Sequence, residues 1–154
     1  MSPKVIVVGV DGSETSLAAL REAASYAKLM SASLRCVTTW NFPAFEEAVG
    51  AYDPEQDAKE IGREATRAVF GEVVPPWVTV VAKLGPAGPA LVDESENASL
   101  LVVGTRGHGA VGRLLLGSVS THCAERSKCP VLVVPGNASD ASSVSDPLPA
   151  AARA

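Results

Sequence analysis

The chain has 154 residues, of which 47% are hydrophobic and 19% are charged, and its formal net charge is −4. The length suits one domain, and so low a charge content with so large an apolar fraction excludes a disordered chain. The acidic balance argues against non-specific binding to nucleic acid or to an anionic membrane.

The first predicted element is a strand over residues 4–10, a continuous apolar run of the kind that is buried on both faces of a parallel sheet. A turn then leads into a helix, for which Ser13 is the predicted N-cap. A second strand is predicted over residues 34–40. After an irregular connection with several chain breakers, the spacing predicts a polar helix over about 55–70.

In the second half of the chain, two prolines end that helix, and a third strand is predicted over residues 77–84. A short helix over about 89–96 leads to a fourth strand over 99–104. A glycine-rich stretch comes next, and a helix over about 118–127 then leads to a fifth strand over 130–134. Residues 137–154 are small, polar and proline-bearing, and we expect this tail to be disordered.

This alternation predicts one α/β domain over residues 1–136, with a five-stranded parallel sheet and helices on both faces, as in Rossmann-like folds. Ligands of such sheets bind beyond the carboxyl ends of the strands, where the strand order reverses. Two loops fall at that edge. The first follows the first strand and carries Asp11, and the second is the glycine-rich stretch after the fourth strand.

Three phosphate-loop patterns overlap in that stretch, GTRGHGAVGRLLLGSVS, residues 104–120. A dinucleotide fingerprint, G-x-G-x-x-G, fits residues 107–112, but it lies outside the first β-α-β unit and the next strand does not end in an acidic residue. A P-loop nearly fits residues 112–118, but Ser118 replaces the lysine that reaches the phosphates. The third pattern, G-x2-G-x9-G-S, accounts for more residues than either.

The third pattern places small residues and hydrogen-bond donors where a phosphate would lie. Gly104 and Gly107 permit close approach to the backbone, and Gly117 with Ser118 opens a helix whose free amides favour an anion. Ser120 adds another hydroxyl. Three basic residues make the loop cationic within an acidic protein: Arg106, His108 and Arg113. For one such loop alone, an ordinary turn followed by an ordinary helix cap remains an equal alternative.

The complete third pattern resembles the nucleotide-binding motif of the universal stress protein family. The resemblance extends to VIVVGVDGSETSLAAL at the first strand and helix, and to KCPVLVVP at the last strand. It covers roughly residues 3–135. What it implies is a site for ATP, often with a divalent ion such as Mg²⁺ or Mn²⁺, and a homodimer. An apolar last strand at a sheet edge, Pro130 to Val134, would form the dimer contact.

The resemblance also implies a role for each matching residue. Asp11 and Thr39 would contact the adenine or ribose, and Val103 and Gly104 would flank the nucleoside. The phosphates would lie along the remaining positions, which come from the loop and the following helix: Arg106, Gly107, Gly117, Ser118, Val119 and Ser120.

We expect a cytoplasmic stress-response or regulatory protein that binds its ligand without turnover, because no residue stands out as a base that activates water. We predict no catalytic residue and no protein-built metal site, since the three cysteines lack the spacing of a metal motif. Three alternatives remain open. They are a cyclic AMP-binding protein that uses the same cleft, a slow ATP-hydrolysing enzyme, and a ligand-free interaction module.

Overall fold

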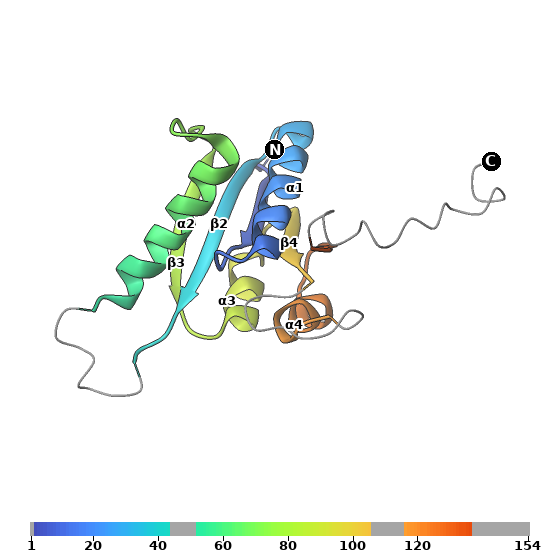
Figure 1. Ribbon diagram of the computed structural model, residues 1–154. Helices are drawn as coiled ribbons and strands as arrows, with labels where there is room; N and C mark the ends of the chain where they lie inside the picture. Colours follow the sequence, from blue (N-terminus) through green and yellow to red (C-terminus); the bar gives the residue numbers. More distant parts are fainter. Residues whose placement is uncertain (1, 44–51, 106–115, 137–154) are drawn as a thin grey trace, which may run out of the picture.

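A computed structural model describes residues 2–43, 52–105 and 116–136 (Figure 1). Strands and helices alternate along these residues as the sequence predicts. In chain order the elements are β1 (Val5–Gly9), α1 (Glu14–Met30), β2 (Ser33–Trp40), α2 (Pro54–Phe70), β3 (Val78–Leu84), α3 (Ala87–Glu94), β4 (Leu100–Gly104), α4 (Ser118–Arg126) and β5 (Val131–Val134).

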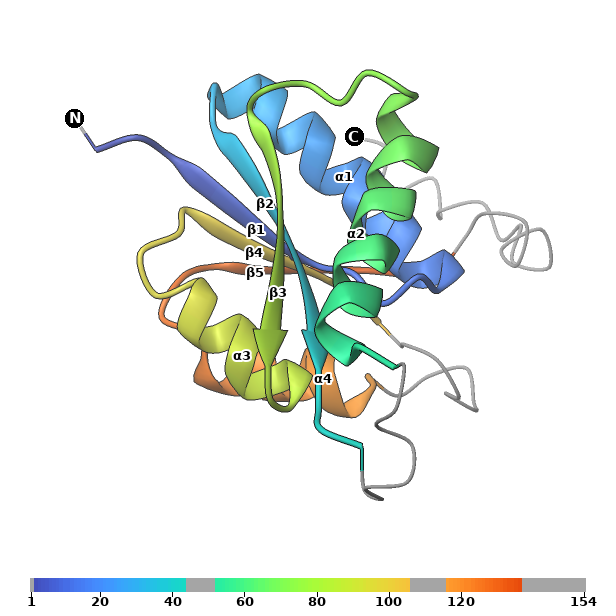
Figure 2. The ribbon, with the colours of Figure 1, turned by 90° about the vertical axis from the view of Figure 1, so that its left-hand side faces the viewer.

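The five strands form one parallel sheet in the order β3-β2-β1-β4-β5, which confirms the predicted fold class. Helices α1 and α2 cover one face, and α3 and α4 cover the other (Figure 2). The chain runs outward from β1 to β2 and β3, then returns to the other side of β1 for β4 and β5. The strand order therefore reverses between β1 and β4, where such folds bind ligands.

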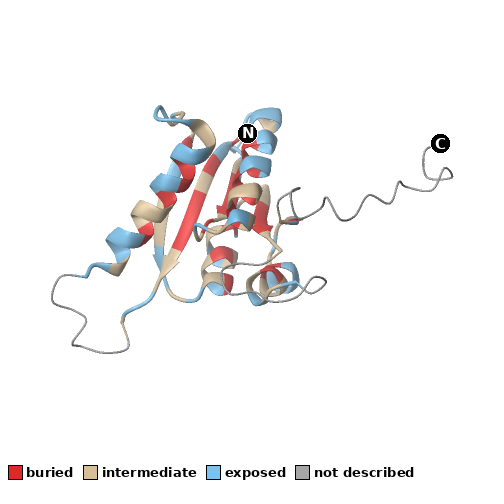
Figure 3. Ribbon diagram, viewed as in Figure 1, coloured by how far each residue is buried: buried red, intermediate tan, exposed pale blue. Residues whose placement is uncertain are grey.

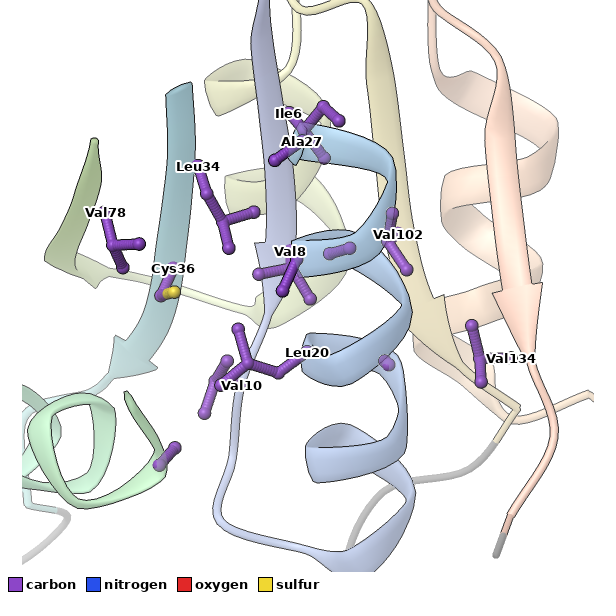
Figure 4. Packing of buried hydrophobic residues seen from close by; sticks show 14 of the residues in the cluster. Ile6, Val8, Val10, Leu20, Ala27, Leu34, Cys36, Val78, Val102 and Val134 are labelled. Carbon is purple, nitrogen blue, oxygen red and sulfur yellow. The ribbon is translucent and has the colours of Figure 1, made fainter. Parts of the chain in front are cut away.

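The core lies on both faces of the central strand (Figure 3). In β1, Ile6 and Val8 face α1 and α2 while Val7 faces the opposite side, and all three are fully buried. Figure 4 shows Val8 beside Leu20 of α1, with Val102 of β4 close by. A strand buried on both faces explains the unbroken apolar run in the sequence. It also fixes the carboxyl ends of β1 and β4 firmly in place.

The predicted boundaries of most elements differ from the observed ones by one residue, whereas α3 begins and ends two residues early. It starts at Ala87, so that Pro89 is its third residue rather than its first. A proline is tolerated there because the first amides of a helix have no acceptor within the helix. The first helical bond runs from the amide of Ala90 to the carbonyl oxygen of Pro86, at 3.1 Å. The predicted tail, residues 137–154, lies outside the described residues.

Candidate functional site

A network of short hydrogen bonds holds the loop after β1. The amide and the hydroxyl of Ser13 both donate to Asp11 Oδ1, at 2.9 and 2.5 Å. Ser13 Oγ in turn accepts the amide hydrogen of Ser16 at 3.2 Å, which confirms Ser13 as the N-cap of α1. Gly12 has a φ of 82°, a conformation that favours glycine. The Asp11 carboxylate is therefore fixed at the carboxyl end of β1, beside the positive end of α1.

The end of β4 packs closely against the start of α1. A Cβ added at Gly104 would lie 2.6 Å from Thr15 Cγ2 and 3.1 Å from the carbonyl oxygen of Thr15. Glycine is thus required here for packing between two elements. The sequence suggested a different reason, close approach of a ligand, and the two are compatible because Gly104 also lines a cavity.

The glycine-rich segment is closed at its base by contacts between Thr105 and the start of α4. The amide of Gly117 donates to the carbonyl oxygen of Thr105 at 2.7 Å. The buried hydroxyl of Ser120 lies 3.0 Å from the same oxygen and 3.0 Å from the carbonyl oxygen of Gly117, so its single proton is shared between the two acceptors. The hydroxyl that the sequence offered to a phosphate therefore already bonds to the backbone. By contrast, Ser118 is exposed.

Gly117 is the N-cap of α4 and, as a glycine, provides no side-chain acceptor for the first amides of the helix. These amides and the helix dipole favour an anion at this end. Gly117 has φ −66° and ψ 169°, an extended conformation open to any residue. The turn therefore does not need the conformational freedom of glycine. What the glycine does provide is a helix start without a side-chain cap among the described residues.

A cavity of about 290 Å³ opens at the carboxyl edge of the sheet, beside the loop after β1, the end of β4 and the first turn of α4. Of the predicted site residues, five line it: Asp11, Thr39, Val103, Gly104 and Val119. Gly117, Ser118 and Ser120 do not line it but share the first turn of α4 with Val119. Arg106 and Gly107 lie outside the described residues. The structure thus brings residues from the loop after β1 and from β2, β4 and α4 around one space.

The cavity wall also contains residues that the sequence did not single out. Ile61 of α2 and Leu91 of α3 contribute apolar surface, and Thr38 lies next to the predicted Thr39. Thr38 is 3% exposed, and its hydroxyl is buried without a hydrogen-bond partner among the described residues. The sequence does contain one indication of this wall, namely two adjacent threonines at the end of a buried strand. Its mostly apolar surface, with a few hydroxyls and one carboxylate, suits a flat ring with polar edges.

The described residues offer little for covalent or metal chemistry. Burial raises the pKa of the Cys36 thiol to about 12, and burial with a smaller contribution from nearby Cys129 raises that of Cys123 to about 11. Both thiols are therefore protonated and unreactive at neutral pH. Within the described ranges, no three His, Cys, Asp or Glu side chains lie together as a metal site would require. None of the helices that the structure describes is long and apolar enough to cross a bilayer.

Comparison with known proteins gives a consistent result. A family model described as "Universal stress protein family" matches residues 3–135. A universal stress protein of Mycolicibacterium smegmatis is 34% identical over 142 residues, which cover 86% of this chain and 48% of the relative. The chain thus spans about half the length of this relative.

Two solved structures share the fold. The universal stress protein UspA from Lactobacillus plantarum superposes with a TM-score of 0.70 at 22% identity, over 87% of this chain and 99% of that one. A universal stress protein in complex with cAMP gives a TM-score of 0.64 at 28% identity, over 89% of this chain and all of the other.

Proposed function

The chain belongs to the universal stress protein family, and we propose that it is a regulatory protein that binds ATP and acts by binding rather than turnover. The observation that carries the proposal is the cavity beside the uncapped start of α4. An apolar space for a nucleoside and a helix start for an anion lie at the same edge of the sheet, where the strand order reverses.

In this proposal the nucleoside occupies the cavity, with Asp11 and Thr39 at the adenine or ribose and with Val103 and Gly104 along its side. The phosphates extend toward the first turn of α4 and toward Arg106 and Gly107. A divalent ion, Mg²⁺ or Mn²⁺, accompanies the nucleotide. Since the described residues hold no ready-made cluster of metal ligands, phosphate oxygens and water supply most of its coordination.

Cyclic AMP is the second candidate ligand, because a structure 28% identical to this chain is a complex with cAMP. A cyclic monophosphate carries one negative charge, which a single helix start can hold. ATP carries more charge and needs more of the glycine-rich segment. Calorimetric titration of the same protein sample with MgATP and with cAMP, at one salt concentration, ranks the two ligands.

Replacement of Gly117 with valine tests where the phosphate binds. We expect ATP binding to fall below detection in isothermal titration calorimetry, because the added side chain would occupy the space in front of the first amides of α4. The chain should remain folded, since the φ of −66° at this position suits any residue. Circular dichroism and urea unfolding check the fold. Unchanged ATP affinity in a folded variant would contradict the proposed phosphate position.

A further inference from the structure

The hydroxyl of Thr38 stands out among the buried polar groups. Among the described residues, Thr38 Oγ1 is the only buried side-chain oxygen or nitrogen atom without a hydrogen-bond partner. Other buried hydroxyls do have partners. Thr66 Oγ1 donates to the carbonyl oxygen of Arg63 at 2.8 Å, and Ser95 Oγ donates to that of Val92 at 3.0 Å. A buried hydroxyl without a partner lowers the stability of the folded chain, so its presence calls for a reason.

The surroundings of Thr38 explain why no neighbour within the described residues pairs with it. Its hydroxyl lies on the α2 side of the sheet, where a Cβ added at Gly62 would be 3.5 Å from Thr38 Oγ1 and 2.5 Å from Val80 Cγ1. The absence of a side chain at Gly62 lets α2 approach β2 closely over this residue. Ile61, the neighbour of Gly62, lines the cavity together with Thr38. The hydroxyl is thus enclosed by apolar groups on one side and by the cavity wall on the other.

We propose that Thr38 recognises the nucleobase, and that its hydroxyl forms a hydrogen bond with a polar atom on the edge of the bound base. This inference rests on the proposed nucleotide function. The ligand would supply the partner that the unliganded chain lacks. A hydroxyl both donates and accepts, so it can pair with an amino group or with a ring nitrogen. Thr38 itself lines the cavity that we assign to the nucleoside.

The sheet topology places Thr38 at the base rather than at the phosphates. The anion-favouring start of α4 follows β4, on one side of β1, whereas Thr38 belongs to β2, on the other side. A nucleotide with its phosphates at α4 therefore extends its nucleoside toward β2. Val10 and Leu91 line the same space and offer apolar contacts to the faces of a flat ring.

The test is Thr38→Val, which removes the hydroxyl and keeps the branched shape. We expect ATP, AMP and 2′-deoxy-ATP to bind more weakly by a common factor of about fivefold to tenfold, measured by calorimetry. The unfolding midpoint without ligand should stay the same or rise, because an unpaired buried hydroxyl is lost. Thr66→Val is the matched control. It removes a paired, buried hydroxyl away from the cavity, so it should leave nucleotide affinity unchanged.

The outcomes separate this inference from the function on which it rests. If the unmodified protein binds no adenine nucleotide, the proposed function is wrong and the role of Thr38 is wrong with it. If it binds ATP and Thr38→Val binds equally well, only the role of Thr38 is wrong. A loss that vanishes with 2′-deoxy-ATP would assign the hydroxyl to the ribose and overturn the base contact. Should the valine variant unfold, Thr38→Ser decides the question, since it must retain affinity if the hydroxyl makes the contact.

Discussion

At the scale of single residues, the glycine that ends β4 shows how one position can serve packing and a binding site together. Gly104 lines the cavity, yet the space beside it belongs to Thr15 of α1. Both the methyl group and the backbone of Thr15 lie within reach of an added Cβ. A side chain there would push α1 away from the sheet and alter the cavity as well.

We therefore expect Gly104→Ala to lower the free energy of unfolding by about 1–3 kcal/mol, the usual effect of overpacking. Adding Thr15→Ser should restore part of this loss, because it deletes the methyl group at 2.6 Å and leaves the carbonyl oxygen at 3.1 Å. Urea unfolding of the two variants and of Thr15→Ser alone gives the coupling between the positions. Independent, additive effects would show that this contact is not the cause.

At the scale of elements, the two serines in the first turn of α4 have different surroundings. Ser120 is buried, and its hydroxyl ties the helix to the end of β4 through the carbonyl oxygen of Thr105. Ser118 is exposed at the helix start, where an anion would lie. The resemblance assigns both serines to the phosphates, whereas in the structure one is buried in a backbone contact and the other is exposed.

Alanine substitutions should separate the two serines. Ser120→Ala removes a buried donor that the Thr105 and Gly117 carbonyl oxygens share, and should cost about 1–3 kcal/mol of unfolding free energy. Ser118→Ala should leave stability within about 0.5 kcal/mol, as most exposed substitutions do, and should weaken ATP binding instead. Thermal unfolding and calorimetry on both variants check this. If Ser118→Ala lost stability and kept full affinity, the division of roles would be reversed.

At the scale of the whole molecule, the sheet has an edge at each side, formed by β3 and by β5. Strand β5 is short and entirely apolar, and three of its four residues are only half buried. An apolar edge strand of this kind invites pairing with another strand unless something covers it. A second copy in antiparallel arrangement would cover it with a self-complementary contact.

We expect the chain to form a homodimer through β5, as the sequence also led us to propose. Leu132→Lys should give monomer or aggregate in light scattering at micromolar concentration, because the charge opposes pairing. Circular dichroism checks the fold of this variant, since Leu132 is half buried against the core. Leu84→Lys is the control, since Leu84 is a 53% exposed residue on the opposite edge strand and its replacement should leave the dimer intact. The buried Val134 is unsuitable for this test because it belongs to the core. A monomeric unmodified protein would refute the dimer.

The parts of the molecule that the sequence predicted are those that depend on local patterns. Unbroken apolar runs identified the strands, and Ser13 identified the start of α1, because capping involves residues three positions apart. The unpaired hydroxyl of Thr38 and the contact between Gly104 and Thr15 could not be predicted in this way. Both depend on how closely a helix approaches a strand that is distant in the sequence.

The hydrogen bonds that flank the glycine-rich segment affect how freely its length and sequence can change in evolution or by design. Thr105 is anchored to Val134 through its amide and to Gly117 through its carbonyl oxygen, so both ends of the segment are held by the framework itself. The entropy of closing a loop changes only with the logarithm of its length. Segments of other lengths and compositions can therefore be grafted between these anchors at small cost in stability. The sequence of the segment can then diverge, or be redesigned, while the scaffold stays constant.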